Sequence, residues 1–128
     1  MQIEKIHTVE APEPVGPYSQ ATKVGNTIYV SGQIGINPLT GKLINENITL
    51  ETERVLRNLE AILEAAGSSL KMVVKCSIFV KDITHFAVIN EVYNDFMGKS
   101  SPARETVEVT RLPLNANIEI SCIAIVSS

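Results

Sequence analysis

The chain has 128 residues, of which 45% are hydrophobic, and a formal net charge of −3. This length and apolar content suit one folded domain and exclude a disordered or fibrous protein. The negative charge disfavours nucleic-acid binding, and the sequence has neither a run of about 18 apolar residues nor the apolar core of a signal peptide, so we expect a soluble cytosolic protein.

The amino-terminal half predicts a loop, a hairpin and a helix. Residues 11–16 contain two prolines and a glycine and are typical of a loop. Residues 19–24 and 27–31 predict two strands that turn at Gly25-Asn26. From residue 49 to 66 the apolar side chains recur at the spacing of a helix, with Thr49 as the expected N-cap. Gly67 stands just after this helix, where a residue in the left-handed conformation is common.

The carboxy-terminal half predicts three strands and a second helix. Residues 72–80 alternate between apolar and polar side chains, which indicates a strand with Val74, Cys76, Ile78 and Val80 on one face. Asp82 can cap a helix that carries Phe86, Ile89, Tyr93 and Phe96 on one side and ends at Gly98. Two further strands are expected at about 104–110 and 117–126.

This order of elements predicts the fold class. Both connections through a helix are long enough to join parallel strands, and the turn at Gly25-Asn26 joins two antiparallel strands. Residues 1–128 are therefore expected to form a single α+β domain, a mixed β-sheet with two helices packed on one face.

The alternation of side chains along the strands also predicts which residues avoid the helices. In the last strand Ile118 and Ile120 share the core side, so Glu119 lies opposite. Val107 is expected to face the helices, which places Arg104 away from the helix-packed core and on the same open face as Glu119. That face also carries apolar residues that nothing in the chain covers, so we expect another subunit to cover it: Tyr29, Phe79, Ile123 and Ile125.

The sequence gives no motif for a metal, nucleotide or redox cofactor. Cys76 and Cys122 each lie within an apolar run and are expected to be buried free thiols rather than a disulfide. His7 and His85 have no partners at metal-ligand spacing.

Three separated motifs occur in this order between residues 16 and 120: Gly16-Pro17-Tyr18-Ser19-Gln20-Ala21, Ser31-Gly32-Gln33-Ile34, and Pro102-Ala103-Arg104 followed by Ile118-Glu119-Ile120. Together they resemble the RidA/YjgF family of imine deaminases, formerly described as L-PSP endoribonucleases or translation inhibitors. The resemblance implies a fold like that of the trimeric α+β chorismate mutases. It also implies a homotrimer with one site in each cleft between subunits, and no cofactor.

By this resemblance Arg104 is the substrate-binding arginine and Glu119 the acid that positions water. A guanidinium can hold a carboxylate through two charge-assisted hydrogen bonds, and a carboxylate can take a proton from water. The alternatives from spacing alone are that Arg104 pairs with a surface acid and that Glu119 is an ordinary strand glutamate on a solvated face.

The remaining residues implied to line the site are Tyr18, Ser31, Asn90 and Thr106. The Tyr18 ring can pack against a ligand, and Ser31 and Thr106 can bind it through a hydroxyl and a backbone amide, respectively. Each has a structural alternative: Tyr18 as a surface aromatic, Ser31 as a turn residue, and Asn90 as a solvent-facing helix residue.

The resemblance implies a 2-iminobutanoate/2-iminopropanoate deaminase that hydrolyses short 2-imino acids, released by pyridoxal-phosphate enzymes, to 2-keto acids and ammonia. Two alternatives remain open. The same cleft could hold a small carboxylate without turnover, as a regulatory module. The older endoribonuclease interpretation is disfavoured by the net charge and by the lack of a paired His or Lys constellation.

Overall fold

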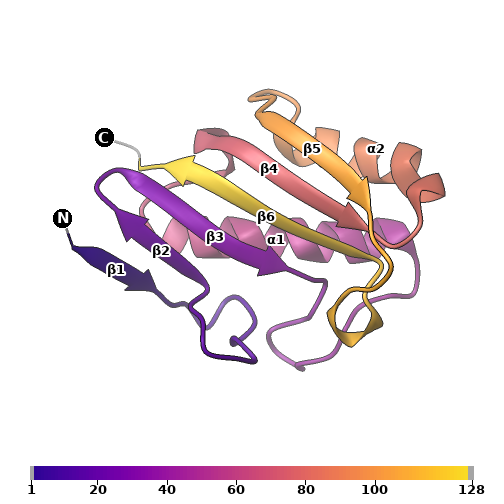
Figure 1. The fold of residues 1–128 in the computed structure, drawn as a ribbon, viewed down its shortest axis with the longest axis horizontal. Helices are drawn as coiled ribbons and strands as arrows, with labels where there is room; N and C mark the ends of the chain where they lie inside the picture. The colour runs from indigo at the N-terminus through magenta and orange to yellow at the C-terminus, as the bar shows by residue number, and fades with distance from the viewer. Residues whose placement is uncertain (1, 127–128) are drawn as a thin grey trace.

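The computed structural model describes residues 2–126 as a sheet of six strands with two long helices on one of its faces (Figure 1). In chain order the elements are β1 (Ile3–Ile6), β2 (Ala21–Val24), β3 (Thr27–Gln33), α1 (Ile48–Ala65), β4 (Val73–Val80), α2 (Phe86–Met97), β5 (Ala103–Glu108) and β6 (Ile118–Ile125). Short 3₁₀ turns lie at Leu70–Met72, Ile83–His85 and Pro113–Asn115.

The strand order β1-β2-β3-β6-β4-β5 confirms the predicted mixed sheet. Strands β4 and β5 are parallel and connected through α2, whereas β6 lies between β3 and β4 and is antiparallel to both. Sequence analysis missed β1, because its four residues include two adjacent charged side chains and give no clear alternation. Strand β5 is left at the edge of the sheet, where one side of its backbone is open.

Helix α1 forms as predicted but begins differently. Its N-cap is Asn47 rather than Thr49, because the Asn47 Oδ1 accepts a hydrogen bond from the Leu50 amide at 2.9 Å. Gly67 follows the helix with φ of +85°, as expected. Glu51 is fully buried in the first turn, and its two carboxylate oxygens accept hydrogen bonds from the backbone and side chain of Asn117 at 2.8 and 2.7 Å.

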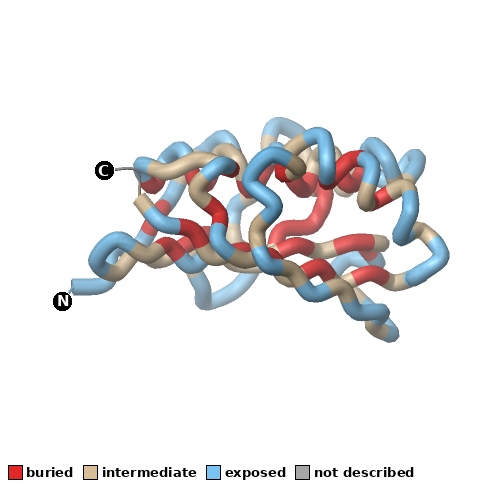
Figure 2. Tube along the Cα trace, turned by 90° about the horizontal axis from the view of Figure 1, so that it is seen from above, coloured by how far each residue is buried: buried red, intermediate tan, exposed pale blue. Residues whose placement is uncertain are grey.

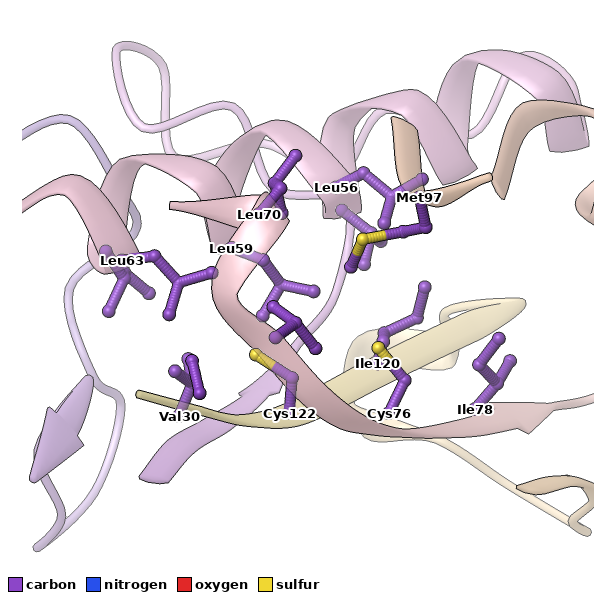
Figure 3. Close-up of a cluster of buried hydrophobic side chains, with 14 of the residues drawn as sticks. Val30, Leu56, Leu59, Leu63, Leu70, Cys76, Ile78, Met97, Ile120 and Cys122 are labelled. Atoms are coloured by element: carbon purple, nitrogen blue, oxygen red, sulfur yellow. The ribbon is translucent and has the colours of Figure 1, made fainter. Parts of the chain in front are cut away.

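The core lies between the helices and one face of the sheet. Buried stretches of the chain occur in both layers, and along the central strands they alternate with more exposed residues (Figure 2). Cys76 and Cys122, on neighbouring strands, are buried free thiols, as predicted. Their sulfur atoms point toward the helical layer, among side chains such as Leu59 and Ile120 (Figure 3).

One prediction for β4 was wrong. Val74 is exposed instead of lying on the core face, because the pairing with β6 shifts between Val73 and Lys75. This irregularity turns Val73 into the core in its place, while Cys76, Ile78 and Val80 are buried as expected. Asp82 caps the short 3₁₀ turn before α2 through the Thr84 amide, and α2 ends at Gly98 as predicted.

The face of the sheet opposite the helices is partly apolar and is not covered by any element within residues 2–126. Tyr29, Val107 and Ile125 are each at least 40% exposed on this open face. The predicted covering subunit remains a prediction. No helix in the described part of the chain has the length and apolar character needed to cross a bilayer.

Candidate functional site

A bulge in β3 shapes the first half of the candidate site. Val30 pairs with Cys122 and Gln33 with Ile120, so the two residues Ser31 and Gly32 stand opposite a single residue of β6. Such bulges bend a strand and redirect its side chains, and they are common next to active sites. The bulge is tied to the preceding loop, because the Ser31 hydroxyl donates to the Ser19 carbonyl at 2.7 Å and the Ser31 amide to the Gln20 carbonyl at 2.9 Å.

Gly32 makes room for the carboxylate of Glu119. A β-carbon at position 32 would overlap the Glu119 carboxylate, so only glycine leaves the space that this side chain occupies. Glu119 points to the open face because its neighbours Ile118 and Ile120 are buried under the helices. Partial burial raises the pKa of Glu119 above its ordinary value, because burial disfavours the charged carboxylate.

Glu119, Tyr18 and Ser31 line one pocket of about 460 Å³, which we call the Glu119 pocket. Tyr18 is half exposed, and its hydroxyl accepts a long hydrogen bond of 3.4 Å from the Val15 amide. The other lining residues are mainly apolar, with a few polar groups: Pro12, Glu13, Pro14, Val15, Gln20, Gly32, Gln33, Ile34, Ile36, Pro113 and Leu114. Three of the six predicted site residues therefore meet here.

Arg104 lies elsewhere, against aromatic rings of α2. Its Cζ is 4.9 Å from the centre of the Tyr93 ring and 5.6 Å from that of Phe86. Such cation–π contacts hold a guanidinium while leaving its N–H donors free to bind a ligand. Arg104 and Tyr93 line a second pocket of about 460 Å³ with Asn90, which we call the Arg104 pocket. Its remaining lining residues are Asn94, Met97, Gly98, Ser101 and Pro102.

Polar groups without partners surround Arg104. The Tyr93 hydroxyl and the Thr106 Oγ1 are buried and have no hydrogen-bond partner in the described part of the chain. Burial, with a smaller contribution from the nearby Cys76 thiol, raises the pKa of Tyr93, so the phenol stays protonated. The Val109 amide donates to the Val80 carbonyl at 2.8 Å, and because amides alternate along a strand, the Thr106 amide points off the open edge of β5.

The expectation that Arg104 and Glu119 share one face of the sheet was wrong. Arg104 is the register partner of Cys76 and lies on the helix side, whereas Val107 pairs with Phe79 on the open face. The physical reason is that α2 offers two aromatic rings to the guanidinium, while the valine is left on the open apolar face. Within one chain the two halves of the site are therefore on opposite faces.

Sequence reasoning missed several residues that build the site. Phe86 and Tyr93 were interpreted only as part of the helical stripe, and the available signal was that each lies about one turn from Asn90 on α2. The motif Ser31-Gly32 did not indicate that Gly32 makes room for the Glu119 carboxylate. In residues 2–126 no three His, Cys, Asp or Glu side chains gather as a metal site.

Comparison with known proteins shows sequence similarity to one family and to its members along nearly the whole chain. The model of the family described as endoribonuclease L-PSP matches residues 8–126. A RutC family protein of Pyrococcus abyssi is 52% identical over 97% of this chain and 98% of its own length. A protein of Dermatophagoides farinae named 2-iminobutanoate/2-iminopropanoate deaminase is 44% identical over 94% of both chains.

Solved structures extend the likeness to the fold. The crystal structure of E. coli TdcF with bound serine is 38% identical and superimposes with a TM-score of 0.92, covering 97% of this chain and 99% of the other. At this identity and coverage the two proteins share a fold over their whole length.

Proposed function

This chain belongs to the endoribonuclease L-PSP family, which includes the RidA/YjgF proteins, and we propose that it hydrolyses 2-imino acids to 2-keto acids and ammonia. The substrates are short 2-imino acids such as 2-iminobutanoate and 2-iminopropanoate. The relative from Dermatophagoides farinae that carries this activity in its name matches along nearly the full length of both chains.

One observation carries the proposal: a guanidinium suited to binding a carboxylate and a carboxylate suited to transferring protons lie in separate pockets on opposite faces of the sheet. We infer that the working site forms between two copies of the chain, with Arg104 from one and Glu119 from the other. The open apolar face with Tyr29, Val107 and Ile125, together with the open edge of β5, supports association into a homotrimer with three such sites.

The Arg104 side holds the substrate. Its guanidinium fork forms two charge-assisted hydrogen bonds with the substrate carboxylate, and the rings of Tyr93 and Phe86 keep the fork in place. The Thr106 amide, which points off the sheet edge, adds a donor, and Asn90 lines the same pocket. Because these groups hold the substrate in a fixed orientation, the rate of hydrolysis increases through proximity.

The Glu119 side performs the proton transfers. Glu119 takes a proton from a water molecule as the water oxygen bonds to the imine carbon, and the C=N double bond becomes single. Glu119 passes this proton to the nitrogen, which gives a tetrahedral carbinolamine with an OH and an NH2 group on the same carbon. Glu119 then takes the hydroxyl proton and transfers it to the nitrogen as the C=O bond forms and the C–N bond breaks, so that ammonia leaves and the 2-keto acid remains. Tyr18 and Ser31 enclose the reacting carbon from the same pocket.

The assay for this activity traps the imine. An amino-acid oxidase generates the 2-imino acid, semicarbazide captures it, and the absorbance of the semicarbazone reports how much escaped hydrolysis. We expect this protein to suppress trapping, and Arg104→Ala to abolish that suppression while the oligomer stays intact. Undiminished trapping with several amino acids would contradict the activity and favour a non-catalytic carboxylate-binding module.

The ribonuclease alternative has little structural support. The described residues that line the Glu119 pocket include no Lys or Arg, which a phosphodiester backbone would require. Cleavage of RNA that persisted in Arg104→Ala and Glu119→Ala preparations free of contaminating nuclease would revive it.

A further inference from the structure

Leu114 has a backbone conformation that its residue type disfavours. Its φ and ψ are 54° and 26°, in the left-handed region, and the following Asn115 has φ of 58°. Asn tolerates this region because its short polar side chain can bond locally, whereas Leu has no such compensation. Leu114 is also 63% exposed, so burial in its own chain does not offset the strain. Strain of this kind persists at sites of function.

The surrounding contacts fix the turn at both ends. The Lys81 ammonium donates to the Asn115 Oδ1, and the Ala116 amide donates to the Pro113 carbonyl at 3.1 Å. Just beyond, the buried carboxylate of Glu51 accepts both hydrogen bonds of Asn117. The strained position of Leu114 is therefore imposed by a rigid turn and is not a product of loop mobility.

The Leu114 side chain forms part of the wall of the Glu119 pocket, together with Val15, Ile34 and Ile36. A volume of about 460 Å³ lies in the range that buries drug-sized ligands, and it far exceeds what the methyl or ethyl side chain of a short imino acid fills. In the proposed site the carboxylate is held at Arg104 of one copy and the imine carbon at Glu119 of another, and the wall around Glu119 is the apolar surface available to the substrate side chain.

We propose that Leu114 is a specificity-determining residue that extends the substrate range from short 2-imino acids to those with longer apolar side chains, such as the one derived from leucine. This inference rests on the proposed imine hydrolysis. It gives the Glu119 pocket a substrate preference, and it explains why an exposed leucine occupies a strained turn.

The test compares Leu114→Ala, which removes the side chain and keeps the strain, with Leu114→Gly, which removes both. Leu39→Ala is the matched control, because Leu39 is 91% exposed and lies outside the pocket. Imines generated from leucine and from alanine are offered to the full-length protein in the trapping assay, and the ratio of the two kcat/KM values is measured.

We expect both Leu114 variants to lower kcat/KM for the leucine-derived imine about tenfold, as for a lost apolar contact in a pocket, with less than about a twofold change for the alanine-derived imine. Leu114→Gly should also unfold at a higher temperature than Leu114→Ala, because glycine adopts the left-handed conformation without strain. The Leu39→Ala ratio should equal that of the wild type.

An unchanged ratio in both Leu114 variants, with activity on the alanine-derived imine retained, would overturn this inference and leave the proposed function intact. A wild-type protein inactive on every imine would overturn both.

Discussion

The Glu119 pocket and the Arg104 pocket hold their functional side chains in different ways. Glu119 lies on the interior strand β6, where register with β3 and β4 fixes its direction and Gly32 leaves the space that it needs. Arg104 lies on the edge strand β5, where only one neighbouring strand constrains the backbone and the rings of α2 hold the side chain. The first half is set by strand pairing, and the second by packing against a helix.

This difference explains why neither half is sufficient. The Glu119 pocket has a proton-transfer group and an apolar wall but no cation among its described lining residues. The Arg104 pocket has the cation, together with buried polar groups that lack partners. In the proposed site each half supplies what the other lacks, and because the halves lie on opposite faces, the proposal needs two copies of the chain to bring them together.

The largest effect is expected when Glu119 can no longer accept a proton. Glu119→Gln should lower kcat/KM about 10²- to 10⁴-fold, the usual contribution of a general base. Because burial raises the pKa of Glu119 in the folded state, ionisation costs more there than in the unfolded chain, and this destabilises the fold above that pKa. The neutral amide should therefore raise the unfolding temperature at pH 7, which a thermal melt measures.

The pH dependence of the wild type checks the same carboxylate. Activity should fall as the pH drops through the raised pKa of Glu119, at a pH above the ordinary value of about 4.3 for glutamate. An acidic limb at or below the ordinary value, or full activity in Glu119→Gln, would contradict this role.

A smaller loss is expected when the space for Glu119 is filled. Gly32→Ala should cost about tenfold in kcat/KM with little change in stability, because the added methyl displaces only the flexible end of the Glu119 side chain. Gly41→Ala is the matched control: its φ is +73° and the space around it is open, so alanine should lower stability by about 1 kcal/mol and spare activity. Rates and chemical unfolding measure both; a Gly32→Ala protein with normal kcat would show that Glu119 is not confined by this contact.

The smallest effect on kinetics is expected when the aromatic ring that supports Arg104 is removed. Tyr93→Leu removes the aromatic ring beneath the guanidinium and should raise KM about fivefold with kcat nearly unchanged, in line with the worth of a partly buried cation–π contact. Tyr93→Phe keeps the ring and should restore the wild-type KM. If both variants raised KM equally, the hydroxyl and not the ring would be the group that positions Arg104.

The sequence predicts the two halves of this site unequally. The face of Glu119 follows from strict alternation in β6, where Ile118, Ile120 and Cys122 are all buried. Alternation in β5 is ambiguous, because Val107 looks like a core residue and yet is 42% exposed on the open face. Which face of an edge strand is covered depends on where α2 packs, and that is a tertiary property which a local pattern does not contain.

The bulge in β3 and the strained turn at Leu114 also could not be predicted from local sequence patterns. Ser31 and Gly32 read as the end of a strand, whereas pairing with β6 continues to Gln33 through the bulge. The left-handed conformation of Leu114 follows from the fixed ends of its turn, since nothing about a leucine indicates it. Helix α1, in contrast, was predictable because its apolar spacing and the glycine after it agree.

The central claim, that each site takes Arg104 from one copy and Glu119 from another, is tested most directly by mixing two inactive proteins. Arg104→Ala and Glu119→Gln chains carrying different tags are co-expressed, and assemblies that contain both are isolated through the two tags in sequence. In a ring of three that contains both chains, one of the three sites receives both intact residues, whichever chain is present twice.

The mixed assemblies should therefore recover about a third of wild-type activity in the trapping assay, while each variant alone stays inactive. Mixed assemblies that contain both chains and remain as inactive as the separate variants would contradict a site shared between copies.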